Sequence, residues 1–185
     1  METLNLVKGQ RVDLTKTNPG LKAIALGLGW DVRNGAGDAF DLDAFAVALK
    51  DGKLDDVVYF NHKTAYSGAI NHSGDNLTGE GAGDDETIVM LLDKIPAGVT
   101  EVMVCVNIYQ AASRRQNFGQ VQNAFIRVYD KDTNTELAKY DLSEDYSAFN
   151  GMVMGKIYLK DSEWKFQAVG EGVNGSIVEI ADKWA

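Results

Sequence analysis

The chain has 185 residues, of which 45% are hydrophobic and 24% are charged, and its formal net charge is −9. This length and composition are typical of one globular domain with its own core, so we expect a single domain over residues 1–185. The acidic balance disfavours nucleic acids and anionic membranes as direct partners, and no apolar run approaches the ~20 residues of a membrane-spanning helix.

Short apolar runs separated by turn signals predict a β-rich domain. The expected strands, in chain order, are residues 22–30, 43–49, 56–60, 87–93, 101–109, 123–130, 135–141, 151–159 and 164–170. A short helix is expected over 110–116, and another near the C-terminus, where Ser176 and Glu179 form a capping box. Many short strands with few helices predict a mainly-β fold, a two-sheet β-sandwich with a short C-terminal helix.

The first long strand has two very different faces. The two-residue period of a strand gives one face four bulky side chains: Ile24, Leu26, Leu28 and Trp30. The other face carries only Ala23, Ala25, Gly27 and Gly29. Because glycines in a strand often mark the close approach of another segment, we expect something to pack tightly on this second face.

Residues 73–86, SGDNLTGEGAGDDE, concentrate negative charge on a glycine-rich loop. The loop holds five carboxylates, Asp75, Glu80, Asp84, Asp85 and Glu86, and no Lys or Arg occurs between Lys63 and Lys94. Closely spaced carboxylates raise each other's pKa unless a cation intervenes. Ca²⁺ takes six to eight oxygen ligands in flexible geometry, which suits such a loop.

The spacing is not that of an EF-hand. Counted from Asp75, Glu86 falls at the expected twelfth position, but Leu77, Gly79 and Glu80 fail at the third, fifth and sixth. The loop also lies between expected strands rather than helices. The sequence therefore predicts a calcium site whose ligand spacing differs from that of an EF-hand.

Further oxygen ligands come from two other segments. Asp41 and Asp43 share one strand face, which Phe45 and the following apolar residues continue, so both are expected where that face opens to solvent. Asp31 follows Trp30 and is expected to reach the same end of the sandwich. With the loop, these eight carboxylates equal all but one unit of the net charge, and they predict one or two adjacent Ca²⁺ ions.

Each acidic segment also has a plainer interpretation. A polar glycine-rich loop is commonly only a solvated turn, and FDLD at 40–43 is also explained by a strand entrance with two exposed aspartates. The metal-site interpretation requires the segments to meet in space. The segment YDKDTNTE, 129–136, spaces Asp130, Asp132 and Asn134 like calcium ligands, but its place between two alternating runs predicts a hairpin turn.

Enzymatic chemistry has little support in the sequence. His62 and His72 are the only histidines, and neither lies in a catalytic-triad or zinc-site pattern. The lone Cys105 cannot form an intramolecular disulfide, and its place in a strand is typical of an inert buried thiol. The N-terminus has no signal-peptide pattern. We therefore expect a cytoplasmic protein that is not an enzyme.

The chain resembles the TerD family of tellurite-resistance and general-stress proteins. The resemblance runs through GLGWD (27–31), FDLDA (40–44), HSGDNLTGEGAGDDE (72–86), NFGQVQNAFIRVYD (117–130) and EWKFQAVGEG (163–172). It implies a cytoplasmic β-sandwich that binds calcium through Asp31, Asp41, Asp43, Asp75, Asn76, Glu80, Asp84, Asp85 and Glu86. The family usually carries an acid where this chain has Ala82, which removes one potential ligand.

The function expected from sequence is thus a non-enzymatic, calcium-ordered interaction module. Its partners would be other proteins of a stress-response or tellurite-resistance assembly, with no nucleic acid and at most indirect membrane contact. One rival is a C2-like module, in which calcium bridges acidic loops to anionic lipid; such a module would favour basic or apolar loop tips, and residues 73–86 offer only Leu77. The other rival is a metal-dependent hydrolase.

Overall fold

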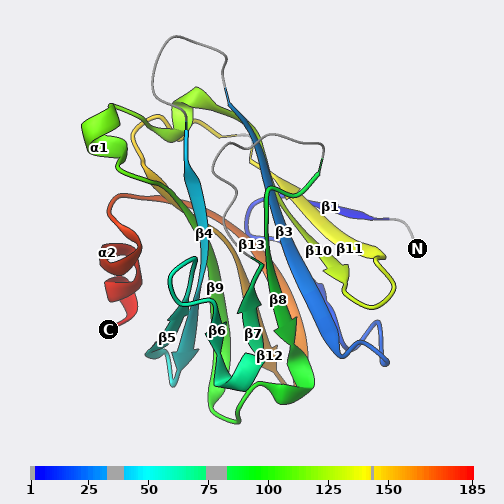
Figure 1. The fold of residues 1–185 in the computed structure, drawn as a ribbon. Helices are drawn as coiled ribbons and strands as arrows, with labels where there is room; N and C mark the ends of the chain where they lie inside the picture. The colour runs from blue at the N-terminus through cyan, green and yellow to red at the C-terminus, as the bar shows by residue number, and fades with distance from the viewer. Residues whose placement is uncertain (1–2, 33–39, 74–82, 143) are drawn as a thin grey trace.

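A computed structural model describes residues 3–32, 40–73, 83–142 and 144–185. These residues form two β-sheets that pack face to face (Figure 1). The seven-stranded sheet has the order β1-β11-β10-β3-β8-β7-β6. Its strands are β1 (Leu4–Leu6), β3 (Ala23–Val32), β6 (Thr64–Ala65), β7 (Ile70–His72), β8 (Glu86–Leu91), β10 (Val121–Asp130) and β11 (Glu136–Asp141).

The second sheet has six strands in the order β2-β13-β12-β9-β4-β5. Its strands are β2 (Arg11–Asp13), β4 (Leu42–Lys50), β5 (Lys53–Val58), β9 (Val99–Ile108), β12 (Gly151–Lys160) and β13 (Glu163–Val173). The α-helices are α1 (Ala111–Arg114) and α2 (Ile177–Ala181), and the 3₁₀ turns are Tyr66–Gly68, Leu92–Lys94, Phe118–Gln120 and Asp182–Trp184. The predicted two-sheet sandwich with a short C-terminal helix is therefore confirmed.

The main core fills the space between the two sheets. From the seven-stranded sheet it takes the bulky face of β3, including Leu28 and Trp30, as the alternation predicts. From the six-stranded sheet it takes small and branched residues, including Ala44 and Val106. The faces predicted for β9 and β10 are the ones that contribute to this main core.

A second apolar cluster lies on the outer face of the six-stranded sheet, where α2 covers it (Figure 1). Phe45 and Cys105, which are register partners on β4 and β9, belong to it. Ile180 of α2 packs against this face and is fully buried. The predicted capping box begins the helix: the Ser176 backbone N–H donates to Glu179 Oε2 over 2.7 Å. The C-terminal helix therefore closes a small core of its own.

Two predicted strand positions need correction. The strand predicted at 56–60 is β5 and begins earlier, at Lys53, because Asp51 and Gly52 form a tight turn with positive φ at both residues (53° and 77°). An Asp-Gly pair is a strong signal for such a hairpin turn. The strand predicted at 87–93 ends at Leu91, where a 3₁₀ turn follows.

The turn predicted at 129–136 is confirmed. It joins β10 to β11, and the Asp130 carboxylate accepts hydrogen bonds from the backbone N–H groups of Asp132 (2.9 Å) and Thr133 (3.4 Å). Partial burial opposes ionisation of Asp130, but these hydrogen bonds prevail and lower its pKa. The acidic residues of this segment are thus explained by the turn. Among the helices that the structure describes, none has the length and apolar character needed to cross a membrane.

The glycine face of β3 is closely covered, as its sequence predicts. A Cβ at Gly27 would overlap the Asp84 carboxylate, and one at Gly29 would overlap the Phe125 ring. We therefore expect Gly27→Ala to lower the free energy of unfolding by about 1–3 kcal/mol, because the added methyl group displaces Asp84.

Gly20→Ala is the matched control for this prediction, because no atom lies within 4 Å of the added Cβ at Gly20. We expect a change within about 1 kcal/mol there. Urea unfolding measures both variants, and equal effects at the two positions would contradict the close packing of Asp84 on β3.

Candidate metal centre

Three of the acidic segments meet at one end of the sandwich. The Asp85 backbone N–H donates to the Leu28 carbonyl over 2.7 Å, and Asp85 Oδ2 accepts from the Trp30 N–H over 2.9 Å. Glu86 Oε2 accepts from the Ala44 N–H over 2.6 Å. The end of GAGDDE is therefore bound to both GLGWD and FDLDA, as a shared site requires.

Glu86 crosses from the seven-stranded sheet to satisfy the backbone of the other sheet. The pairing of β4 with β5 reaches only Ala46, so Ala44 has no strand partner on that side. Glu86 Oε2 accepts from the Ala44 N–H, and His72 Nε2 lies 3.0 Å from the Ala44 carbonyl oxygen. Because a carbonyl only accepts, His72 Nε2 carries the hydrogen. The side chains of Glu86 and His72 thus make the hydrogen bonds to the Ala44 backbone that a neighbouring strand would otherwise make.

The His72–Glu86 pair is deeply buried. His72 Nε2 lies 3.3 Å from Glu86 Oε2, and both side chains are 1% exposed. A carboxylate in such a place is unfavourable unless it is hydrogen-bonded, and here the Ala44 N–H and the imidazole surround it. Glu86 therefore holds the two sheets together at the acidic end.

Asp84 forms an ion pair on the outer face of the seven-stranded sheet. Its carboxylate accepts two hydrogen bonds from Arg127, from Nε over 2.6 Å and from Nη2 over 2.8 Å. Arg127 lies opposite Gly27 in the register of β10 and β3, so the missing side chain at Gly27 leaves room for Asp84. Hydrogen bonding to Asp84 raises the pKa of Arg127.

The pKa of Asp85 is raised by its surroundings in the acidic cluster. Burial raises the pKa of Asp85, the hydrogen bond from the Trp30 N–H opposes that rise, and the nearby charges of Asp31, Glu86 and Asp84 add to it. The ionised carboxylate is therefore disfavoured, and a nearby cation would relieve it.

The remaining predicted ligands lie on β3 and at the start of β4. Asp31 is exposed, and its Oδ2 accepts from Asn123 Nδ2 over 2.7 Å. The Asp41 carbonyl accepts from the Tyr109 N–H over 2.8 Å. Asp43 is 3% exposed and lines a cavity on the outer face of the six-stranded sheet. Asp41 and Asp43 therefore differ in burial, with Asp43 the more enclosed.

The described residues give only part of the predicted ligand set. Asp75, Asn76 and Glu80 lie outside them. Within the four described ranges, no group of three or more His, Cys, Asp or Glu side chains is arranged to hold a metal ion. The donor type fits a hard cation, because every predicted ligand offers oxygen, and burial together with nearby carboxylates raises the pKa of Asp85.

Sequence reasoning missed two important partners. Arg127 appeared only as a strand residue, although the glycine face of β3 indicated that something packs there. His72 was considered only as an unsuitable metal ligand, whereas the structure gives it the Ala44 carbonyl and Glu86. Neither contact follows from spacing, because Arg127 is 43 residues from Asp84 and His72 is 28 residues from Ala44 in the chain.

Comparison with known proteins places these features in a family. Residues 2–184 match the TerD domain. The chain belongs to the TerD domain family. It is 44% identical over 184 residues to General stress protein 16U of Bacillus subtilis (strain 168), covering 97% of this chain and 95% of that protein. It is 43% identical over 186 residues to Tellurium resistance protein TerD of Serratia marcescens, covering 98% and 97%.

A solved structure extends the TerD likeness to three dimensions. It is described as a homologue of the telluride resistance protein TerD from Streptomyces coelicolor A3(2), and it superimposes with a TM-score of 0.73 at 26% sequence identity. The match covers 88% of this chain and 96% of that one. The fold is thus shared with this relative at 26% sequence identity.

Proposed function

We propose that this chain is a non-enzymatic, calcium-binding stress-response protein of the tellurite-resistance type. In this proposal Ca²⁺, as one or two ions, binds the acidic segments at one end of the sandwich and orders them as a surface for partner proteins of a cytoplasmic stress-response assembly. Membership of the TerD family and the printed names of its relatives, General stress protein 16U and Tellurium resistance protein TerD, support the stress-response role.

The observation that carries the calcium proposal is the meeting of three acidic segments. Asp85 bonds to Trp30 of GLGWD, and Glu86 bonds to Ala44 of FDLDA. Burial, and to a smaller extent the neighbouring carboxylates, raise the pKa of Asp85 and so disfavour its ionised form, and a divalent cation with oxygen ligands would offset this cost.

The proposed ligand set keeps eight of the nine residues predicted from sequence. Asp31, Asp41, Asp43, Asp75, Asn76, Glu80, Asp85 and Glu86 would offer oxygens to the ion. Asp84 is the member whose carboxylate already holds Arg127, so within this proposal it contributes mainly through its charge and through the position of the loop on β3.

Calcium should bind more tightly than magnesium. Mg²⁺ requires compact octahedral geometry and gives up its water reluctantly, whereas a wide cluster of many oxygens suits the larger ion. Calorimetric titration of metal-free protein should show saturable Ca²⁺ binding, and Mg²⁺ binding should be weaker by about tenfold or more. Absence of Ca²⁺ binding at millimolar concentration would overturn the proposal, and equal affinity for Mg²⁺ would favour the hydrolase class instead.

A further inference from the structure

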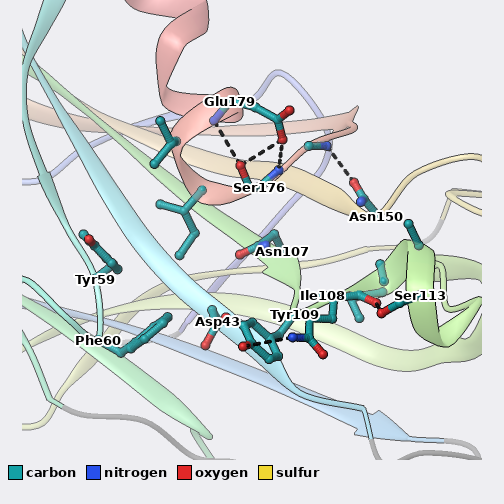
Figure 2. A pocket seen from close by; sticks show the side chains of 16 residues that line it. Asp43, Tyr59, Phe60, Asn107, Ile108, Tyr109, Ser113, Asn150, Ser176 and Glu179 are labelled. Carbon is teal, nitrogen blue, oxygen red and sulfur yellow. Dashed lines mark hydrogen bonds between the residues drawn. The ribbon is translucent and has the colours of Figure 1, made fainter.

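A cavity of about 650 Å³ lies on the outer face of the six-stranded sheet, between α1 and the start of α2. Strands β4 and β9 contribute Asp43 and Asn107, the segment after β5 contributes Tyr59 and Phe60, and Ser176 stands at the beginning of α2 (Figure 2). This volume lies within the range of sites that bind small molecules. The cavity therefore has the size of a ligand site.

An unsatisfied polar atom lies among the residues that line this cavity. Asn107 is 5% exposed, and its Oδ1 has no hydrogen-bond partner among the described residues. Buried side-chain oxygens normally have a partner, so an exception calls for an explanation. Figure 2 shows Asn107 among the side chains that line the cavity.

Asp43 stands beside this oxygen. Asp43 and Asn107 are direct register partners on β4 and β9, so their side chains lie on the same face of the sheet. That face is the outer one, because the next partners along the strands, Phe45 and Cys105, belong to the cluster under α2. A carboxylate and an amide oxygen, both hydrogen-bond acceptors, are thus placed side by side.

The rest of the lining in the described chain combines aromatic, apolar and polar side chains and includes no cation. Three aromatic side chains, Tyr59, Phe60 and Tyr109, line the cavity, and none of its lining residues in the described chain is Lys, Arg or His. Its second carboxylate is Glu179, whose pKa is lowered by hydrogen bonds from Ser176. At the rim, Tyr109 is 39% exposed and Val178 is 64% exposed.

The neighbouring cations do not line the cavity. The Arg114 guanidinium lies 5.4 Å from the centre of the Tyr109 ring, and Lys183 donates to Glu171 over 2.7 Å. The lining thus combines negative charge and aromatic faces, which together attract organic cations.

We propose that this cavity binds a small organic amine in its ammonium form. The ammonium group donates hydrogen bonds to the Asp43 carboxylate and to Asn107 Oδ1, and the hydrocarbon body lies against Tyr59 and Phe60. An ammonium group has three donors and no acceptor, so it can donate to Asn107 Oδ1 and form an ion pair with the Asp43 carboxylate at the same time. The cavity shares Asp43 with the calcium proposal, but neither that proposal nor the TerD family match assigns an organic ligand to it.

The test avoids residues of the proposed calcium site. Asp43 belongs to the predicted calcium ligands, so the variants change Asn107 and Ala112 instead, and binding is measured in EGTA. Failure of calcium binding then leaves this test unaffected, and the reverse holds as well.

The probe is 2-phenylethylammonium, with 2-phenylethanol and phenylacetate as neutral and anionic molecules of similar shape. Titrations followed by calorimetry and by protein NMR should show saturable binding of the ammonium compound. The alcohol and the carboxylate should bind about tenfold more weakly or not at all, because charge-assisted hydrogen bonds are lost. Absence of ammonium binding at ~10 mM, the weak end of specific small-ligand affinity, or equal binding of phenylacetate, would overturn the proposal.

Four variants locate the site. Asn107→Leu removes the acceptor and should weaken ammonium binding about tenfold, whereas Asn107→Asp keeps an acceptor, adds charge and should bind at least as tightly as the wild type. Ala112→Trp places a ring at the cavity in α1 and should abolish binding, while Ala97→Trp, on an exposed residue that does not line the cavity, should leave binding unchanged. Wild-type affinity in Ala112→Trp would refute the assignment even if Asn107→Leu failed to fold.

Discussion

Glu86→Leu is expected to lower the free energy of unfolding by roughly 2–4 kcal/mol. Leucine has a similar size but accepts no hydrogen bond, so the Ala44 N–H loses its partner at the point where β5 has ended. His72 loses the carboxylate next to its Nε2 at the same time. The Ala44 N–H would remain buried between the two sheets without a partner, while His72 keeps its contact with the Ala44 carbonyl, so the lost hydrogen bond of Ala44 accounts for most of the effect.

Glu86→Gln separates the structural role of this residue from its charge. Glutamine keeps an oxygen that accepts from the Ala44 N–H, so we expect a loss below about 1.5 kcal/mol in EGTA. Urea unfolding of both variants in EGTA measures the difference. If leucine and glutamine destabilised the protein equally, the bond from Ala44 to Glu86 would not be what holds the sheets together here.

The long strands could be predicted from sequence because their alternation is strong. The faces of β3, β9 and β10 all follow the two-residue period, and the core confirms them. Four short strands, β1, β2, β6 and β7, were missed because two or three residues are too few to show a period. The start of β5 was missed although Asp51-Gly52 marks it, because Lys53–Val58 is mostly polar or half-buried.

The sequence indicated which segments form the candidate site, but it did not indicate which residues contact one another within it. The acids of residues 84–86 were recognised by their density, and their meeting with Trp30 and Ala44 supports the idea of a shared site. Which partner each of these acids contacts depends on how the strands pair in the folded protein. Arg127 meets Asp84 only because β10 pairs with β3 opposite Gly27, and no local pattern carries that information.

Calcium is expected to stabilise the protein by about 2.7 kcal/mol at a concentration 100 times its Kd, if only the folded state binds the ion. For a domain of this length, such a gain raises the melting temperature by several degrees. Thermal unfolding in EGTA and in excess Ca²⁺ measures the shift. An unchanged melting temperature would contradict the calcium proposal.

The Asp85→Asn variant should reverse its effect with calcium. Burial raises the pKa of Asp85 above its ordinary value. A carboxyl group whose pKa is raised in the folded protein stabilises the fold at pH values below its ordinary pKa. That stabilisation is lost as the pH rises through the raised pKa of the folded state. Ionised Asp85 therefore opposes folding, so its replacement by Asn should stabilise the protein in EGTA. In saturating Ca²⁺ the gain should shrink or turn into a loss, because a charged ligand is gone.

Asp84→Asn is the matched comparison, with a different expected sign. Asn cannot form the two charge-assisted bonds that Arg127 now donates, so Asp84→Asn should destabilise the protein by roughly 1–2 kcal/mol even in EGTA. Both variants remove one negative charge from adjacent positions, so general charge relief would shift their melting temperatures alike. Opposite shifts in EGTA, with a calcium-dependent reversal only for Asp85→Asn, are the expected result. Parallel shifts would mean that the ion pair with Arg127 contributes nothing and that the two carboxylates share one environment.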